Sequence, residues 1–183
     1  STDDQKIIQI AKRYKKISIP FVRPKYLASD TTSMVSVILH LLGKLKINYL
    51  TEYIVLLQPT TPFRKSSELN KMIDFAIKNN FNSVVAVTKV WHHPSEYLYM
   101  QGEKIKYILD PEENTRRQDF KDVYFITGAA YVVKTSFIRE KEKFINADSK
   151  IFELSESSMI DIDSSLHLDI ARGYSLIKKI KSN

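Results

Sequence analysis

Two carboxylates stand two residues apart, at Asp161 and Asp163, directly before a segment with helical periodicity. In an extended backbone successive side chains alternate between faces, so both carboxylates would project together while Ile160 and Ile162 point towards a core. Mg²⁺ is usually held by one or two protein carboxylates together with substrate phosphates. The pair therefore predicts a magnesium site and, with it, a phosphate-bearing substrate.

Asp163 also has a simpler interpretation. Aspartate is a favoured N-cap, and a helix is expected over residues 164–178, so Asp163 alone could cap that helix. A cap needs only one carboxylate, which leaves Asp161 as the stronger metal-ligand candidate.

Three further polar segments could bind an anion or a sugar. Residues 58–64 (Gln-Pro-Thr-Thr-Pro-Phe-Arg) follow an expected strand, and ligands of open α/β sheets bind beyond the carboxyl ends of strands. The alternative is that the two prolines only shape a loop and that Arg64 is a surface residue. Arg23 precedes Pro24, so its backbone is expected to be extended, which suits bidentate phosphate recognition; an ordinary surface charge is the alternative. Residues 29–33 place hydroxyls at an expected helix start, where capping alone explains most of them and anion binding is the alternative.

The composition excludes several classes. The chain has 183 residues, 43% of them hydrophobic, which is enough for one domain with a core. It has no cysteine, and the adjacent His92 and His93 cannot easily share one ion, so no zinc site is expected. The net charge is +7, but the lysine clusters at 12–16 and 178–181 resemble helix ends, so no nucleic-acid partner is expected. No apolar run could span a bilayer and no signal-peptide pattern is present, so a cytoplasmic location is expected.

The periodicity alternates between helix and strand. Helices are expected over residues 3–15, 33–45 (with Thr31 or Thr32 as cap), 66–78 and 164–178, and strands over 53–57, 83–87 and 125–133. The uniformly apolar strand 53–57 is expected to be buried on both faces. Strand, helix and strand with short connections indicate a crossover unit and a parallel sheet in an α/β fold. Residues 89–122 depart from this pattern, with a hairpin at Gly102, and suggest a lid or a dimerisation arm.

The motif order resembles the acylneuraminate cytidylyltransferases, the CMP-sialic acid synthetase family that includes enzymes for legionaminic and pseudaminic acid. The most specific matches are residues 58–64 and 161–164; weaker ones are 1–4, 23–31, 92–94, 117–118 and 128–131. The resemblance covers nearly the whole chain. It implies a single cytidylyltransferase-like domain over 1–183, with an open, doubly wound, mostly parallel Rossmann-like sheet of the nucleotide-diphospho-sugar transferase type and a dimerisation arm at 89–122.

The resemblance also implies an activity, namely transfer of CMP from CTP to an acidic nine-carbon sugar with release of pyrophosphate. The implied catalytic residues and Mg²⁺ ligands are Asp161 and Asp163, and a homodimer is implied. The implied nucleotide contacts are Arg23, Ser29, Asp30, Thr31, Thr32 and Ser33. The implied sugar contacts are Gln58, Thr60, Arg117, Thr127 and Tyr131.

The chain departs from the family pattern in three places. Family members begin with a Gly-rich phosphate loop, which has no counterpart here, so the chain is expected to be N-terminally incomplete and a poor binder of CTP by itself. Thr127 replaces a frequent asparagine, and Glu96 replaces a lysine of some sialic acid enzymes, which argues against N-acetylneuraminate as the sugar. The alternatives are a 3-deoxy-manno-octulosonate cytidylyltransferase and a non-catalytic, truncated remnant.

Overall fold

A computed structural model describes residues 1–46, 52–110 and 120–180 of the chain. The chain divides into two compact units, residues 1–54 with 133–148 and residues 55–132 with 149–183. The single domain over 1–183 and the separate role of residues 89–122 stay predictions.

The first unit contains the helices α1 (Gln5–Ala11), α2 (Met34–Lys44) and α4 (Thr135–Lys141) and the 3-10 helix η1 (Lys25–Leu27). Ser33 is the N-cap of α2, because its hydroxyl accepts the backbone N–H of Ser36 at 3.1 Å. The predicted caps Thr31 and Thr32 are therefore wrong. The Thr32 hydroxyl is already used, since it lies 2.8 Å from the Ser29 hydroxyl and donates to the Tyr26 carbonyl at 3.1 Å.

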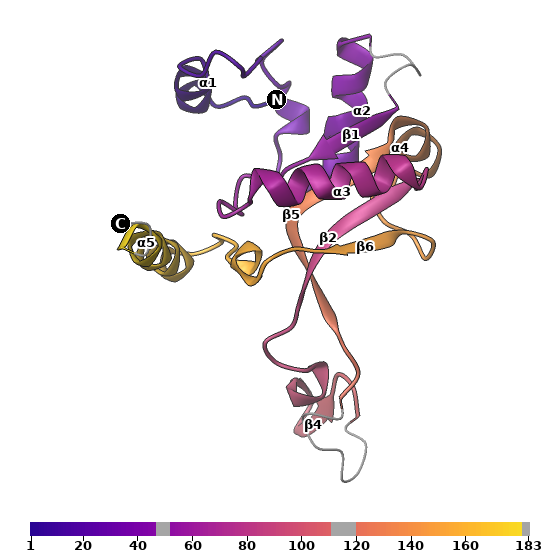
Figure 1. The fold of residues 1–183 in the computed structure, drawn as a ribbon, viewed down its shortest axis with the longest axis vertical. Helices are drawn as coiled ribbons and strands as arrows, with labels where there is room; N and C mark the ends of the chain where they lie inside the picture. The colour runs from indigo at the N-terminus through magenta and orange to yellow at the C-terminus, as the bar shows by residue number, and fades with distance from the viewer. Residues whose placement is uncertain (47–51, 111–119, 181–183) are drawn as a thin grey trace. The chain divides into compact units, whose positions relative to one another are not determined.

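The main sheet has the strand order β1-β5-β2-β6, formed by β1 (Tyr53–Leu56), β5 (Tyr124–Lys134), β2 (Ser83–Lys89) and β6 (Lys150–Glu153). Strands β2 and β6 pair in parallel. Between β2 and β5, Val90 N–H donates to Val123 and the Thr127 hydroxyl to Ala86, so the contacts advance in opposite directions along the two strands, as in an antiparallel pair. The α/β class is confirmed, with a sheet that mixes both kinds of pairing (Figure 1).

Burial differs sharply between β2 and β1. Residues 83–88 of β2 are all buried, as expected for a strand with neighbours on both sides. Strand β1 was predicted to be buried on both faces, and this is wrong, since Val55 is 39% exposed. In the described sheet β1 is an end strand, paired with β5 alone.

Helix α3 (Ser66–Lys78) has the predicted bounds and packs on β2. Its buried face includes Met72 and Ala76, which are both 0% exposed. The ring of Phe75 contacts those of Phe81 and Phe152, with centroids 5.1 and 5.6 Å apart. The apolar face that the helical periodicity indicated is thus the face against the sheet.

A separate antiparallel hairpin is formed by β3 (Leu98–Gln101) and β4 (Lys104–Tyr107), after the 3-10 helix η2 (Pro94–Glu96). Gly102 lies in its turn with φ +64°, a conformation that glycine adopts without steric cost. The predicted hairpin is therefore confirmed. All eight strand residues are exposed.

The chain ends in the 3-10 helix η4 (Glu156–Met159) and the helix α5 (Ser165–Ile180). Ser164 is the cap of α5, because its hydroxyl accepts the backbone N–H of His167 at 3.3 Å. The interpretation of Asp163 as the cap is therefore wrong. Lys178 and Lys179 lie in the last turn, where the helix dipole favours cations. Within the described residues, no helix is long and apolar enough to cross a membrane.

The cap assignment predicts which substitution destabilises α5. Ser164→Ala removes the acceptor for His167 N–H and should lower the free energy of unfolding by about 1 kcal/mol. Asp163→Asn should change it by less than about 0.5 kcal/mol, because Ser164 and not Asp163 caps α5. Urea denaturation of both variants measures the difference, and a larger loss in Asp163→Asn would contradict the assignment.

Candidate functional site

The loop after β1 is closed by Arg64. Its guanidinium donates to the backbone carbonyl of Gln58 and, at 2.9 Å, to the hydroxyl of Thr61, which is fully buried. The Thr61 hydroxyl in turn donates to the Gln58 carbonyl at 3.2 Å. Burial lowers the pKa of the Arg64 guanidinium from its ordinary value, consistent with a half-buried position. Arg64 therefore shapes the loop and is not a surface charge.

Gly128 gives the Gln58 side chain its place. A Cβ atom on Gly128 would lie 2.5 Å from Gln58 Oε1, far inside van der Waals contact, and Gly128 has φ +68°. The amide of Gln58 thus lies directly over the backbone of β5. Its neighbour Thr127 is buried, and the Thr127 hydroxyl donates to the Ala86 carbonyl at 3.3 Å. A sugar contact by Thr127 stays a prediction.

Asp161 lies beside this loop and Tyr131. The backbone N–H of Ile162 donates to the Thr60 carbonyl at 2.9 Å, which ties the aspartate segment to the residue 58–64 loop. Burial raises the pKa of the Tyr131 phenol above its ordinary value of 10.0, and the nearby charge of Asp161 raises it further. The structure therefore brings Gln58, Thr60, Tyr131 and Asp161 together in the second unit.

Asp161 has an atom that needs a partner. Its Oδ1 is buried and has no hydrogen-bond partner within the part of the chain that the structure describes. A buried, unpaired carboxylate oxygen is costly, so such an atom indicates a missing cation or donor. The described residues contain no group of three or more His, Cys, Asp or Glu side chains that could hold a metal. Mg²⁺, which needs few protein ligands, fits this arrangement.

Asp163 has a different environment. It is exposed, and its backbone N–H donates to His167 Nδ1 at 3.2 Å. The segment around it is not a strand, contrary to the alternating geometry that the sequence predicted. His167 was missed by the sequence reasoning, although its place four residues after Asp163 in the first helical turn could have suggested the contact.

Helix α5 is joined to the same loop by an aromatic contact. The rings of Phe63 and Tyr174 meet edge to face, with centroids 4.8 Å apart. Because Phe63 belongs to the loop and Tyr174 to the middle of α5, this contact joins the helix to the loop.

The predicted nucleotide-side residues lie in the first unit. The Arg23 guanidinium donates to Ser1, both to its hydroxyl at 3.3 Å and to its backbone carbonyl. The Ser29 hydroxyl lies 3.2 Å from that of Thr31 and 2.8 Å from that of Thr32. Most of these hydroxyls therefore serve local structure, while Asp30 is exposed. Arg117 lies outside the described residues.

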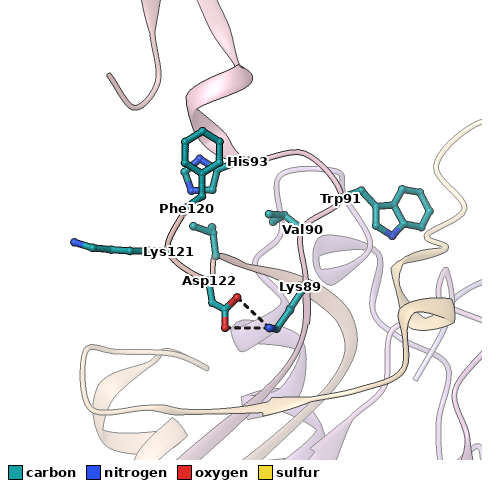
Figure 2. Close-up of a pocket in the computed structure, with 8 residues that line it drawn as sticks. Lys89, Val90, Trp91, His93, Phe120, Lys121 and Asp122 are labelled. Atoms are coloured by element: carbon teal, nitrogen blue, oxygen red, sulfur yellow. Dashed lines mark hydrogen bonds and ion pairs between the residues drawn. The ribbon is translucent and has the colours of Figure 1, made fainter. Parts of the chain in front are cut away.

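A hollow of about 300 Å³ lies where residues 89–122 leave and rejoin the sheet. Figure 2 shows Lys89 reaching the Asp122 carboxylate, with both oxygens 3.0 Å from Nζ, and the His93 ring against Phe120. These two rings are stacked with centroids 4.3 Å apart. The contacts pair the outgoing and returning chain segments, and the sequence reasoning did not identify them.

The site geometry predicts distinct effects at two glycines with the same backbone conformation. A Cβ atom on Gly102 would meet open space, so Gly102→Ala should lower the free energy of unfolding by about 1 kcal/mol, from the positive φ alone. Gly128→Ala should lower the free energy of unfolding by a similar amount, because the flexible Gln58 side chain can move away from the new Cβ atom. The Gln58 amide must then leave its native position. NMR of the Gln58 side-chain amide should therefore show a large shift in Gly128→Ala and none in Gly102→Ala. Equal spectra would contradict the contact.

The Tyr131 environment predicts a pH dependence of stability. A raised pKa in the folded state means that the stability contribution is present below the unfolded value and is lost as pH rises through the folded value. Unfolding free energy should therefore fall above pH 10 more steeply in the native chain than in Tyr131→Phe. Urea denaturation from about pH 8 to 11 measures the two slopes. Parallel slopes would contradict the assignment.

The comparison with known proteins gives the family. The model of the family described as Cytidylyltransferase matches residues 1–182. The chain is 29% identical over 168 residues to the CMP-N,N'-diacetyllegionaminic acid synthase of Legionella pneumophila, covering 90% of this chain and 71% of that protein. It is 26% identical over 174 residues to the pseudaminic acid cytidylyltransferase of Campylobacter jejuni, covering 94% and 75%. The N-acylneuraminate cytidylyltransferase of Streptococcus agalactiae is 26% identical over 168 residues, covering 90% and 39%. The predicted family is confirmed, and the chain belongs to the cytidylyltransferases.

Proposed function

We propose that this protein transfers CMP from CTP to a nonulosonic acid and releases pyrophosphate. The observation that carries the proposal is the buried Oδ1 of Asp161, which has no hydrogen-bond partner among the described residues and lies beside Tyr131 and the Gln58 loop. The legionaminic, pseudaminic and neuraminic acid enzymes among the relatives support the sugar class.

In the proposed reaction the sugar hydroxyl forms a bond to the α-phosphorus of CTP. The bond from that phosphorus to the oxygen bridging to the β-phosphate breaks, and pyrophosphate leaves with the electron pair. The hydroxyl proton passes to a carboxylate of the Asp161 and Asp163 pair. Mg²⁺, held by these two carboxylates, would supply charge neutralisation at the phosphate. The protein's own contribution is to position the reacting groups and to stabilise the charge that develops on the phosphate.

On the sugar side, the half-buried Gln58 amide supplies a donor and an acceptor for sugar hydroxyls. The Tyr131 phenol is protonated at neutral pH even at its ordinary pKa of 10.0, and burial raises that pKa further, so its O–H is proposed to donate to the sugar. Arg117 is proposed to pair with the sugar carboxylate, and Thr60 to contact the sugar. On the nucleotide side, Arg23 and the hydroxyls of residues 29–33 are proposed to bind CTP.

Which nonulosonic acid is used is proposed on the basis of one charge. Glu96 lies 3.4 Å from His92 and carries a carboxylate where some sialic acid enzymes have lysine. This favours a substrate other than N-acetylneuraminate.

We also propose that a second copy of this chain covers the β3-β4 hairpin. Apolar side chains of the hairpin are exposed, with Leu98 48%, Met100 64% and Ile105 58% accessible. Exposed apolar surface of this kind is typical of subunit interfaces.

The carboxylate assignment is tested by turnover. In the complete protein, Asp161→Asn should reduce CMP-sugar formation by about two orders of magnitude or more, with the fold retained. Asp163→Asn should also reduce turnover, and any loss reflects the charge because Ser164 provides the cap. Pyrophosphate release with CTP, Mg²⁺ and a panel of nonulosonic acids measures both.

Asp169→Asn is the matched control, since Asp169 is an exposed aspartate of α5 paired with Arg172 at 3.1 Å. Its turnover should equal that of the native protein. Native turnover in Asp161→Asn would refute the metal assignment, and the absence of a CMP-sugar with every acid in the panel would refute the proposed function.

A further inference from the structure

The chain between β6 and α5 carries both aspartates but has no strand or α-helix of its own. Its regular structure is η4, a single 3-10 turn, in which Ser158 N–H donates to the Ser155 carbonyl at 2.9 Å. Two backbone hydrogen bonds hold its ends. Leu154 N–H donates to the Val87 carbonyl at 2.8 Å, and Ile162 N–H donates to the Thr60 carbonyl at 2.9 Å. The position of Asp161 therefore depends on what holds the turn between these ends.

Glu68, in the first turn of α3, provides such a hold. Its Oε1 accepts the backbone N–H of Ser155 at 3.3 Å, and its Oε2 accepts the Ser155 hydroxyl at 3.1 Å. Ser155 is the N-cap residue of η4, and 87 residues separate it from Glu68 in the sequence. A carboxylate that takes the N–H of a cap residue acts as the glutamate of a capping box does, but here it comes from another helix.

We propose that Glu68 is a positioning residue for Asp161, an inference that rests on the proposed function of the Asp161 site. Both of its oxygens are directed at one residue, and hydrogen bonds to an ionised carboxylate are stronger than neutral ones. The 3-10 turn that follows contains the buried Ser157 and Ser158 and ends two residues before Asp161. By fixing the start of the turn, Glu68 restricts where Asp161 Oδ1 can lie.

A purely local role for Glu68 is the competing explanation. The Glu68 carboxylate also lies 3.3 Å from Lys65 Nζ, one turn earlier. Lys65 is 45% exposed, and exposed pairs of this spacing contribute little. An acidic residue in the first turn also interacts favourably with the helix dipole, but that interaction would stabilise α3 and leave the aspartate segment unchanged.

The experiment compares Glu68→Ala, Ser155→Ala, their double variant and the control Asp74→Ala in the complete protein. Asp74 is an exposed acid of the same helix, so its removal changes the charge of α3 without touching Ser155. Hydrogen exchange of residues 155–163 is measured without substrates or metal, and kcat and KM are measured with them.

In Glu68→Ala, exchange in residues 155–163 should rise about tenfold or more, while exchange in β2 and α3 stays at the native rate. Turnover should fall by roughly 10- to 100-fold, with KM for CTP and sugar changed less than about threefold. Ser155→Ala should give a smaller effect in the same direction, and the double variant should equal Glu68→Ala. Asp74→Ala should match the native protein.

Native exchange in residues 155–163 of Glu68→Ala would overturn the proposal. So would a uniform rise in exchange over the whole chain, because that would show a general stabilising role. Faster exchange with native turnover would also overturn it, since Asp161 would then need no positioning. If the native protein forms no CMP-sugar, the proposed function fails, and the exchange measurement alone decides whether Glu68 holds the Asp161 segment.

Discussion

The buried backbone of β2 is the constraint on which the site depends. Every residue from 83 to 88 is buried, so each N–H and C=O there requires a partner from the protein. Two of the carbonyls take partners that lead directly to the site. Ala86 accepts the hydroxyl of Thr127, next to Gly128, and Val87 accepts the N–H of Leu154, at the start of the aspartate segment. Satisfying β2 therefore also sets where Gln58 and Asp161 can lie.

The site combines rigid supports with a carboxylate oxygen left unsatisfied. Arg64 closes the Gln58 loop, and Ile162 and Ser155 hold the aspartate segment to the loop and to α3. Among the described residues, Asp161 Oδ1 and Ser158 Oγ of this segment are both buried without a hydrogen-bond partner, and Asp161 is the one that carries a carboxylate. Leaving such an atom unpaired reduces stability unless a ligand supplies the missing interaction, which is typical of a binding site.

The β3-β4 hairpin lies outside the main sheet and differs from it in burial. The β3-β4 hairpin is exposed throughout, and its strands have only each other as neighbours in the described residues. An isolated two-stranded hairpin is marginally stable in water. At its base the stacked rings of His93 and Phe120 and the exposed pair Lys89–Asp122 join the outgoing and returning chain (Figure 2). A partner subunit over the hairpin would add the burial that it lacks.

Local patterns were sufficient for the elements but not for their details. Periodicity predicted α3 over its observed residues and most of the strands, because the spacing of apolar residues reflects local geometry. The caps were wrong at both helices, with Ser33 in place of Thr31 or Thr32 and Ser164 in place of Asp163. Neighbouring hydroxyls and carboxylates have similar capping ability, and the cap is the one that directly precedes the first helical residue, Met34 in α2 and Ser165 in α5.

The sequence by itself determined the family and the α/β class, and it identified Asp161 and Gln58 as candidate site residues, since motif order and residue type are properties of the sequence. Only the tertiary structure decided the strand order β1-β5-β2-β6, the exposure of Val55, the contact of Gly128 with Gln58 and the hold of Glu68 on Ser155. These features join residues far apart in sequence. Their energies depend on which surfaces meet after folding, and no local pattern records that.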